Sequence, residues 1–188
     1  NIRQPGFGVG GYCLTKYPLF AKIAAKEILN IRGHDFLFST NAVSVNSKMP
    51  LESLKKLTKY FKNNLKGKRL LIMGVTYRED IGDTRFSPSE VFARAAINKG
   101  ALIEAYDPLV ENWPELNDIK LLNQLPTAEN YDAILFTVAH KYFKKIKIQS
   151  WLKNKKTLIF DTNNVLTLIQ RKIISDGGYN FLYIGRGK

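Results

Sequence analysis

Beyond residue 66, the chain alternates short, nearly continuous apolar runs with more polar stretches. The apolar runs span 69–75, 102–107, 133–138, 157–161 and 181–184. Runs of this kind are typical of strands buried on both faces of a parallel sheet. Helical segments are predicted between most of them, most clearly at 87–99 and 165–174. This alternation predicts an α/β fold, an open and mainly parallel sheet with helices on both faces.

The first 65 residues carry a helical periodicity instead. One helix is predicted from Pro18, which suits the first helical position, up to a break at 32–35. A second is predicted from about Ser39 to Leu65, interrupted or kinked at Pro50. The apolar stripes that support them are Phe20, Ile23, Ala24, Ile28 and Ile31 in the first helix, and Leu54, Leu57, Phe61 and Leu65 in the second. A helix this long is marginal without a packed partner, so the second stripe packs either on its own domain or on another chain.

Two arginines follow the first predicted strand. Ligands of parallel sheets bind at the carboxyl ends of strands, which places residues 76–85 in the binding crevice. Arg78 and Arg85 carry the paired donors that suit diphosphate oxygens, and Tyr77 can stack or hydrogen-bond beside them. The alternative is that either arginine simply pairs with Asp80 or Asp83.

Cys13, the sole cysteine, follows a glycine-rich loop and precedes the first predicted helix. A helix N-terminus and the nearby Lys16 both favour the thiolate form. An isolated cysteine is more often a small buried hydrophobe, but the closely spaced glycines favour a reactive thiol that a ligand can approach.

The same loop matches the dinucleotide fingerprint G-x-G-x-x-G at Gly6, Gly8 and Gly11. That fingerprint requires a preceding strand and an acidic residue about 20 positions later. Only five residues precede Gly6, and one of them is Pro5, so no strand fits. We therefore expect no dinucleotide site at this loop.

Two blocks of sequence carry a specific resemblance. Residues 8–16 read G-V-G-G-Y-C-L-T-K, and residues 74–88 read G-V-T-Y-R-E-D-I-G-D-T-R-F-S-P. They resemble the patterns G-x-G-G-x-C-x-x-K-D and G-x-x-[FY]-K-x-x-x-x-D-x-R-x-S-P of the UDP-glucose/GDP-mannose dehydrogenase family. The segments Tyr106-Asp107-Pro108 and 184–187 are also similar to that family. The resemblance covers nearly the whole chain but only the family's C-terminal portion, so we expect the NAD domain to be missing from this chain.

The resemblance implies a fold, a chemistry and a set of site residues. The fold is a Rossmann-like UDP-sugar-binding domain at 66–188, preceded at 1–65 by the cysteine loop and central dimerisation or linker helices. The reaction is the NAD-dependent oxidation of the C6 alcohol of a UDP-sugar to a uronic acid, through a thiohemiacetal and a thioester on the cysteine. The implied roles are nucleophile for Cys13, substrate binding for Gly8, Gly10, Gly11, Tyr77 and Arg78, and cofactor binding for Arg85, which Asp83 orients. A homodimer through the central helix is the implied assembly.

Two positions depart from the family pattern. Tyr17 replaces an aspartate thought to help manage the hydrolytic water, and Asn163 stands where many members have arginine. An N-acetylated UDP-sugar is slightly favoured over UDP-glucose, and a non-catalytic nucleotide-sugar-binding or dimerisation module is the alternative. His34 and His140 have no second ligand near them in sequence, so we predict structural roles for them and no metal.

The net charge of +13 is large for 188 residues, and lysines cluster between 141 and 156. We interpret the cluster as a solvated face, and a basic nucleic-acid-binding domain as a remote alternative because no nucleic-acid motif accompanies the charge. No apolar run approaches the roughly 18 residues of a membrane span. These features predict a cytoplasmic protein with no membrane contact and no specific nucleic acid partner.

Overall fold

The computed structural model describes residues 6–184 of the chain. Its helical elements are α1 (Tyr12–Lys16), η1 (Tyr17–Leu19), α2 (Phe20–Glu27), α3 (Leu37–Tyr60), α4 (Pro88–Ile97), η2 (Pro114–Leu116), η3 (Ala128–Asn130), α5 (Lys141–Lys144), α6 (Ile148–Trp151) and α7 (Leu168–Asp176). Its strands are β1 (Arg69–Met73), β2 (Leu102–Tyr106), β3 (Lys120–Leu122), β4 (Ala133–Phe136), β5 (Leu158–Asp161) and β6 (Asn180–Tyr183). The predicted similarity at 185–187 lies outside the described residues.

The six strands form one parallel sheet in the order β3-β2-β1-β4-β5-β6. The chain runs outward from β1 to β3 and then returns to the other side of β1, so the winding direction reverses between β1 and β4. In open α/β sheets the ligand crevice lies at this reversal, beyond the carboxyl ends of the strands. The predicted α/β, Rossmann-like sheet is confirmed.

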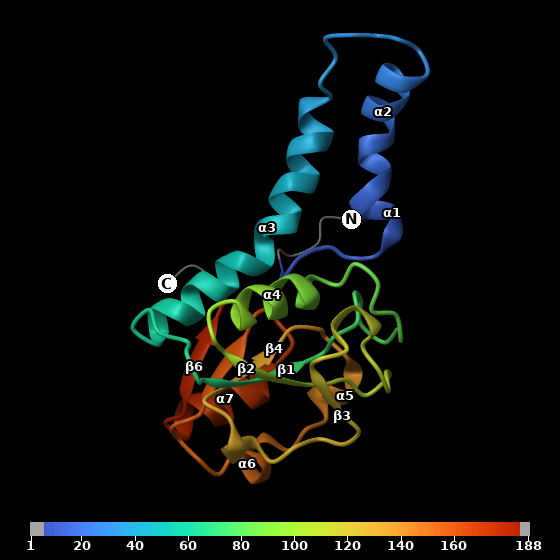
Figure 1. The fold of residues 1–188 in the computed structure, drawn as a ribbon. Helices are drawn as coiled ribbons and strands as arrows, with labels where there is room; N and C mark the ends of the chain where they lie inside the picture. The colour runs from blue at the N-terminus through green and yellow to red at the C-terminus, as the bar shows by residue number, and fades with distance from the viewer. Residues whose placement is uncertain (1–5, 185–188) are drawn as a thin grey trace.

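Central strand β1 is packed on both faces, which explains its unbroken apolar sequence. Leu70 and Ile72 join the core beneath α3 and α4, whereas Leu71 and Met73 join the core against α5, α6 and α7. Figure 1 shows these two helical layers on either side of the sheet. Helix α4 begins as predicted, because Pro88 takes the first helical position and the Ser87 hydroxyl caps the helix.

The N-terminal helices differ from their predicted bounds. Helix α1 begins at Tyr12, so Pro18 lies inside the short 3-10 turn η1 rather than at the first helical position. Helix α3 ends at Tyr60, five residues before the predicted Leu65, because Lys62 and Asn63 take left-handed conformations with φ of 52° and 63°. The predicted interruption at Pro50 lies inside α3, which bends near its middle in Figure 1.

The second apolar stripe packs on its own domain, which is one of the two alternatives that the sequence left open, and the homodimer through the central helix stays a prediction. Leu54 and Leu57 are buried in the core shared with α4, and Phe61 packs against the same core. This packing crosses the predicted domain boundary at residue 65, and the boundary itself stays a prediction.

The sequence patterns missed several short elements. Strand β3 has three residues, none of them fully buried, so it leaves no apolar run to detect. Helices α5 and α6 have four residues each, which is too short for a helical periodicity to show.

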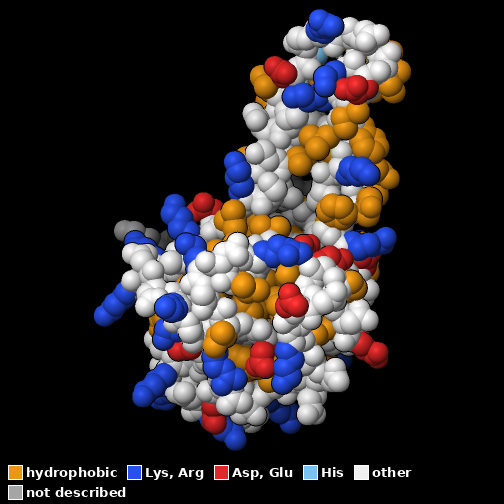
Figure 2. Space-filling view, in the orientation of Figure 1, with side chains coloured by type: hydrophobic (Ala, Val, Ile, Leu, Met, Phe, Trp, Pro, Cys, Tyr) orange, Lys and Arg blue, Asp and Glu red, His pale blue; other side chains and the backbone are white. Residues whose placement is uncertain are grey.

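A helical arm projects from the sheet domain (Figures 1 and 2). It consists of α1, η1 and α2 packed beside the first half of α3, residues 37–49. Exposed apolar side chains cover much of the surface of the arm and of the chain between α2 and α3, and they include Leu14, Phe20, Ile23, Ile28, Leu29, Leu37, Phe38 and Val45. Within residues 6–184, no helix is both long and apolar enough to cross a membrane.

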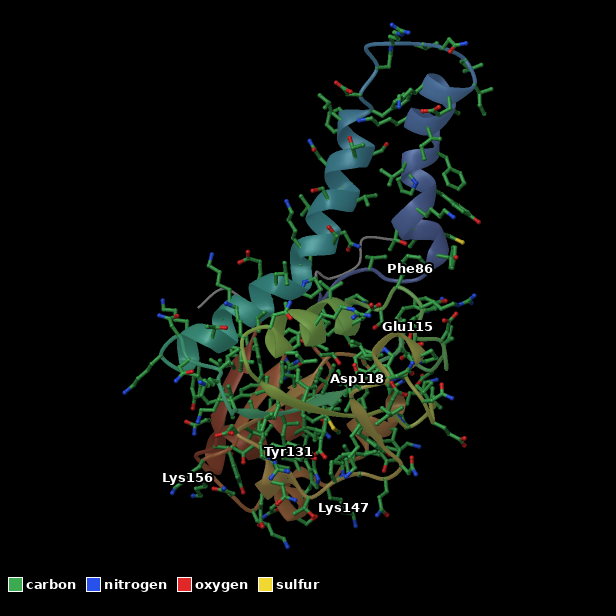
Figure 3. The ribbon with its side chains drawn as sticks, viewed as in Figure 1. Phe86, Glu115, Asp118, Tyr131, Lys147 and Lys156 are labelled. Carbon is green, nitrogen blue, oxygen red and sulfur yellow. The ribbon has the colours of Figure 1, made fainter. Side chains whose placement is uncertain are left out.

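The clustered lysines between 141 and 156 are all exposed. Lys147 and Lys156 project from the end of the sheet domain that lies farthest from the arm (Figure 3). None of the clustered lysines lines the cleft described next. Their positions therefore fit the interpretation of a solvated face.

Candidate functional site

A cleft of about 1310 Å³ lies where the base of the arm meets the carboxyl ends of β1 and β4. Four segments line it: the glycine loop at 6–11 with the start of α1, the first half of α3, the β1–α4 loop, and the turns after β4 and β5. The structure brings every predicted site residue to this cleft, namely Gly8, Gly10, Gly11, Cys13, Tyr77, Arg78 and Arg85.

The glycine loop lies directly on the β1–α4 loop. A Cβ atom on Gly10 would come within 2.6 Å of the Phe86 carbonyl oxygen and 2.7 Å of the Tyr77 Cβ. One on Gly11, whose φ is +79°, would lie 2.8 Å from the Tyr77 ring. Glycine is therefore required by the approach of two protein segments. The loop leads into α1.

Two asparagines hold the glycine loop in place. The Asn46 side chain accepts a hydrogen bond from the Val9 N–H at 2.8 Å and donates one to the Val9 carbonyl at 2.7 Å. Asn163 Oδ1 accepts from the Phe7 N–H at 3.3 Å, and its Nδ2 donates to the Thr137 carbonyl at 2.8 Å. Asn163, known from sequence only as a departure from the family arginine, thus ties the loop to the end of β4. Sequence gave no signal for Asn46.

Cys13 is exposed and lies in the first turn of α1, so the alternative of a small buried hydrophobe does not apply. Tyr17 is one helical turn further on, and its backbone N–H donates to the Cys13 carbonyl. A side-chain hydrogen bond with Cys13, the charge of that thiol and partial desolvation raise the pKa of Tyr17 above its ordinary value. Lys16 instead lies over the Tyr12 ring, with its Nζ 5.3 Å from the ring centroid.

Arg85 pairs with Asp83, the arrangement that the sequence left open. Arg85 Nη2 lies 2.7 Å from Asp83 Oδ2, and Nε lies 3.0 Å from Oδ1. This hydrogen bond is the main reason that the pKa of Asp83 is lowered and that of Arg85 is raised. The Arg85 guanidinium also lies 5.7 Å from the centroid of the Tyr12 ring, which links it to the start of α1. The Phe86 ring packs edge-on against the Tyr12 ring, and the two ring centroids are 4.8 Å apart. Phe86 lies beside the base of the arm (Figure 3).

Arg78 is different, because among residues 6–184 its guanidinium has no ion-pair or hydrogen-bond partner. Asp80, one of the two carboxylates that the sequence offered as a partner, binds Lys141 instead, at 3.0 Å from the Lys141 backbone nitrogen and 3.2 Å from its Nζ. The backbone hydrogen bond from Lys141 is the main reason that the pKa of Asp80 is lowered. The exposed Arg78 side chain therefore lines the cleft with its donors unused.

A buried polar network lies under the cleft. The sequence analysis singled out its members Asp107 and His140 but did not connect them. Asp107, from the Tyr-Asp-Pro segment at the end of β2, accepts hydrogen bonds from the Val75 N–H at 2.8 Å and the Leu109 N–H at 3.0 Å. His140, at the start of α5, lies 3.1 Å from the same carboxylate. Both side chains are buried, and together they connect three strand ends. Nowhere in the described part of the chain do three or more His, Cys, Asp or Glu side chains form a group suited to a metal ion.

Comparisons with known proteins add to this geometry. Residues 71–168 match the family model described as "UDP-glucose/GDP-mannose dehydrogenase family, UDP binding domain". The chain is 33% identical to the UDP-N-acetyl-D-mannosamine dehydrogenase of Methanocaldococcus jannaschii, over 100% of this chain and 41% of that protein. It is 25% identical to the UDP-glucose 6-dehydrogenase of Rickettsia conorii, over 98% of this chain and 43% of that protein.

Solved structures agree with the fold. A UDP-D-ManNAc dehydrogenase from Pyrococcus horikoshii has a TM-score of 0.73 at 26% identity, covering 100% of this chain and 41% of that one. An NDP-N-acetyl-D-galactosaminuronic acid dehydrogenase from Methanosarcina mazei has the same fold, with a TM-score of 0.80 at 24% identity over 98% of this chain and 40% of that one. The chain thus spans about two fifths of the length of the proteins it matches.

Proposed function

Because the chain belongs to the UDP-glucose/GDP-mannose dehydrogenase family, we propose that it is the UDP-sugar-binding part of an NAD-dependent nucleotide-sugar 6-dehydrogenase. The observation that carries this proposal is that one cleft is lined by both Cys13 and Arg78, whose guanidinium has no partner among residues 6–184. A nucleophile and a diphosphate-binding group at one site are what a covalent mechanism on a nucleotide sugar requires.

The uridine diphosphate is proposed to bind at the β1–α4 loop. The Arg78 guanidinium offers two parallel donors to the diphosphate oxygens, and the Tyr77 side chain lines the cleft next to Arg78. The sugar then extends towards the glycine loop, where Gly8, Gly10 and Gly11 leave backbone rather than side chains on the surface. This orientation brings the sugar C6 towards α1 and Cys13.

Cys13 is proposed to capture the C6 aldehyde. Its thiolate sulfur adds to the carbonyl carbon, a C–S bond forms, and the carbonyl oxygen takes up a proton to give a thiohemiacetal. Tyr17, whose hydroxyl hydrogen-bonds with the Cys13 side chain, is a polar group one helical turn further along the chain. In this chain it stands where relatives of the family carry an acid, so it supplies a hydroxyl in place of a carboxylate.

We propose that NAD is bound mainly outside the described residues. NAD would remove hydride from the substrate, but the spaces beside Gly10 and Gly11 are filled by Tyr77 and Phe86 rather than open to a pyrophosphate. Arg85 is the one residue that we propose to reach towards the cofactor, from the exposed rim of the cleft. We therefore assign this chain the tasks of binding the substrate and holding the aldehyde.

An N-acetylated UDP-sugar is proposed as the substrate in preference to UDP-glucose. The support is the 33% identity to a UDP-N-acetyl-D-mannosamine dehydrogenase, against 25% for a UDP-glucose 6-dehydrogenase. The same proposal extends to a homodimer. Because Leu54 and Leu57 are buried in the domain, the dimer contact would use the exposed apolar side chains of the arm, such as Phe38.

Calorimetric titration with UDP and with NAD tests the proposed function. UDP should bind, and NAD should bind more weakly or not at all. Arg78→Ala should weaken UDP binding by about 1–3 kcal/mol, because a charged hydrogen bond is lost. Arg69→Ala is the matched control, since Arg69 begins β1, at the end of that strand away from the Arg78 loop, and its replacement should leave the affinity unchanged. NAD binding as tight as UDP binding would overturn the assignment.

A second candidate, a nucleotide-sugar-binding module without catalysis, is favoured by Tyr17, which stands where the family pattern that this sequence resembles has an aspartate. A UDP-sugar with an aldehyde at C6 separates the two candidates without any cofactor. If Cys13 captures aldehydes, this compound should protect the thiol from alkylation more than the corresponding alcohol does at equal occupancy. Equal protection by the two compounds would favour the non-catalytic module.

A further inference from the structure

His140 is a buried imidazole whose two ring nitrogens both hydrogen-bond beneath the β1–α4 loop. Its side chain is 1% exposed. Nδ1 lies 2.9 Å from the backbone nitrogen of Asp80. A backbone N–H can only donate, so Nδ1 must carry no proton, and in the neutral ring the proton is on Nε2. The ring is therefore an acceptor towards the loop and a donor towards the interior.

The donor nitrogen, Nε2, is also connected to the loop, through the Thr76 hydroxyl. Nε2 lies 3.1 Å from Asp107 Oδ2 and 3.0 Å from Thr76 Oγ1. The Thr76 hydroxyl in turn donates to the Arg78 carbonyl at 3.0 Å. His140 thus contacts the loop backbone at Asp80, two residues after Arg78, and also reaches the Arg78 carbonyl through one hydroxyl. The loop backbone is therefore held by hydrogen bonds at Arg78 itself and at Asp80, two residues further on.

The loop conformation at Asp80 needs such a restraint. Its φ is 57°, in the left-handed region that residues other than glycine adopt at a cost. His140 binds its N–H, and the next residue, Lys141, donates its own N–H to the Asp80 carboxylate at 3.0 Å. Two consecutive residues at the start of α5 thus hydrogen-bond the backbone N–H and the side-chain carboxylate of Asp80 and stabilise this conformation.

We propose that His140 is a positioning residue for nucleotide-diphosphate binding, because its Nδ1 holds the Asp80 backbone and thereby directs Arg78 into the cleft. The proposal rests on the proposed function, in which Arg78 binds the diphosphate. His140 does not touch the ligand. It acts through the loop, and among its contacts the Nδ1 bond to Asp80 is the one that determines affinity.

Two substitutions separate the nitrogens. His140→Asn places an amide oxygen near the position of Nδ1 and can still accept from Asp80, whereas His140→Gln places its amide near Nε2 and keeps the contact with Asp107. UDP titration should show an affinity within about 3-fold of wild type for His140→Asn and a loss of about 10-fold for His140→Gln, the loss expected for one hydrogen bond.

Thr157→Val controls for lost stability. The buried Thr157 hydroxyl donates to the Tyr131 carbonyl at 3.0 Å, far from the cleft residues, so this variant should lose stability without losing UDP affinity. Hydrogen–deuterium exchange over residues 77–83 in the ligand-free protein gives a second readout. Exchange there should be faster in His140→Gln than in wild type, and close to wild type in His140→Asn.

The outcomes distinguish the two proposals. If wild type fails to bind UDP, the proposed function fails, and the exchange data alone decide whether His140 holds the loop. If wild type binds UDP but His140→Gln binds equally well, the positioning role is overturned. The role is also overturned if His140→Asn and His140→Gln weaken binding equally, or if residues 77–83 exchange alike in both variants.

Discussion

The sheet domain and the helical arm differ in the burial of their apolar side chains: the domain buries them, whereas the arm exposes many of them. In the sheet domain, strand β1 buries four consecutive apolar residues completely. In the arm, Phe38 is 96% exposed and Ile28 is 73% exposed. Helix α3 contains both behaviours, since Leu57 near its end is fully buried while Leu37 at its start is 64% exposed. One continuous helix therefore belongs to a packed core at one end and to an open surface at the other.

This difference shows what periodicity can and cannot predict. Both α2 and the second half of α3 have apolar stripes at helical spacing, and the patterns alone give no reason to treat them differently. The sheet supplies a partner for Leu54 and Leu57, but the exposed face of the arm meets nothing within the described part of the chain. The four predictions below test this contrast, from the largest expected effect to the smallest.

Leu57→Ala and Leu37→Ala make the same chemical change at the two ends of α3. Leu57→Ala should lower the free energy of unfolding by about 2–5 kcal/mol, because it leaves a cavity in the core beneath α4. Leu37→Ala, at an exposed site, should change it by about 0.5 kcal/mol or less. Urea denaturation measures both. Similar losses in the two variants would show that the arm has a core of its own.

Phe38→Glu tests whether the exposed surface of the arm binds a second copy. If it does, the substitution should weaken dimerisation by about 2 kcal/mol or more, as at a central aromatic contact. Ser47→Glu adds the same charge at an exposed polar position of α3 and should have little effect. Sedimentation or light scattering over a concentration series reports the result. A wild-type protein that stays monomeric at high micromolar concentration would refute the proposed dimer.

Gly11→Ala and Gly33→Ala compare the base of the arm with its tip. Both glycines have positive φ, +79° and +87°, so both substitutions strain the backbone. Only Gly11 lies against Tyr77, whereas nothing lies within 4 Å of a Cβ on Gly33. Gly11→Ala should therefore cost about 1–3 kcal/mol more in unfolding free energy, through overpacking. Equal costs would mean that the glycine loop does not dock on the β1–α4 loop.

Cys13→Ala should produce the smallest effect, a shift in the titration of Tyr17. The hydrogen bond with Cys13 raises the pKa of Tyr17, so removing the thiol should lower that pKa towards the ordinary value of 10.0. Because the folded-state pKa is the higher one, the stabilising contribution is present below pH 10.0 and is lost as the pH rises through the folded-state pKa. NMR of tyrosine ring carbons, with Tyr17→Phe for assignment, measures the shift. An unchanged pKa would show that the two side chains do not interact.

The sequence predicted most of the sheet because each long strand has an apolar run of its own. It could not predict β3, whose three residues are held mainly by backbone pairing with β2. It also could not decide whether the second stripe of α3 packs on its own domain or on another chain, because the neighbouring core of α4 exists only once the chain is folded.

The candidate site divides in the same way. Cys13, Tyr77, Arg78 and Arg85 carry recognisable chemistry in recognisable motifs, and all of them line the cleft. Asn46 and His140 act through backbone groups that lie 37 and 60 residues away in sequence. Contacts of this kind depend on the fold and have no local pattern. His140 was expected to be structural, and its burial and hydrogen bonds agree with a role inside the fold.

The central claim is that the cysteine loop of the arm and the Arg78 loop of the sheet domain form one site. Alkylation of Cys13 by iodoacetamide tests this claim most directly, because Cys13 is the sole cysteine and the modification has a single possible position. A saturating UDP-sugar should slow alkylation of the wild type, and at the same concentration should protect Arg78→Ala much less than Arg69→Ala. Alkylation at an unchanged rate, with UDP-sugar shown to be bound by calorimetry, would contradict the account.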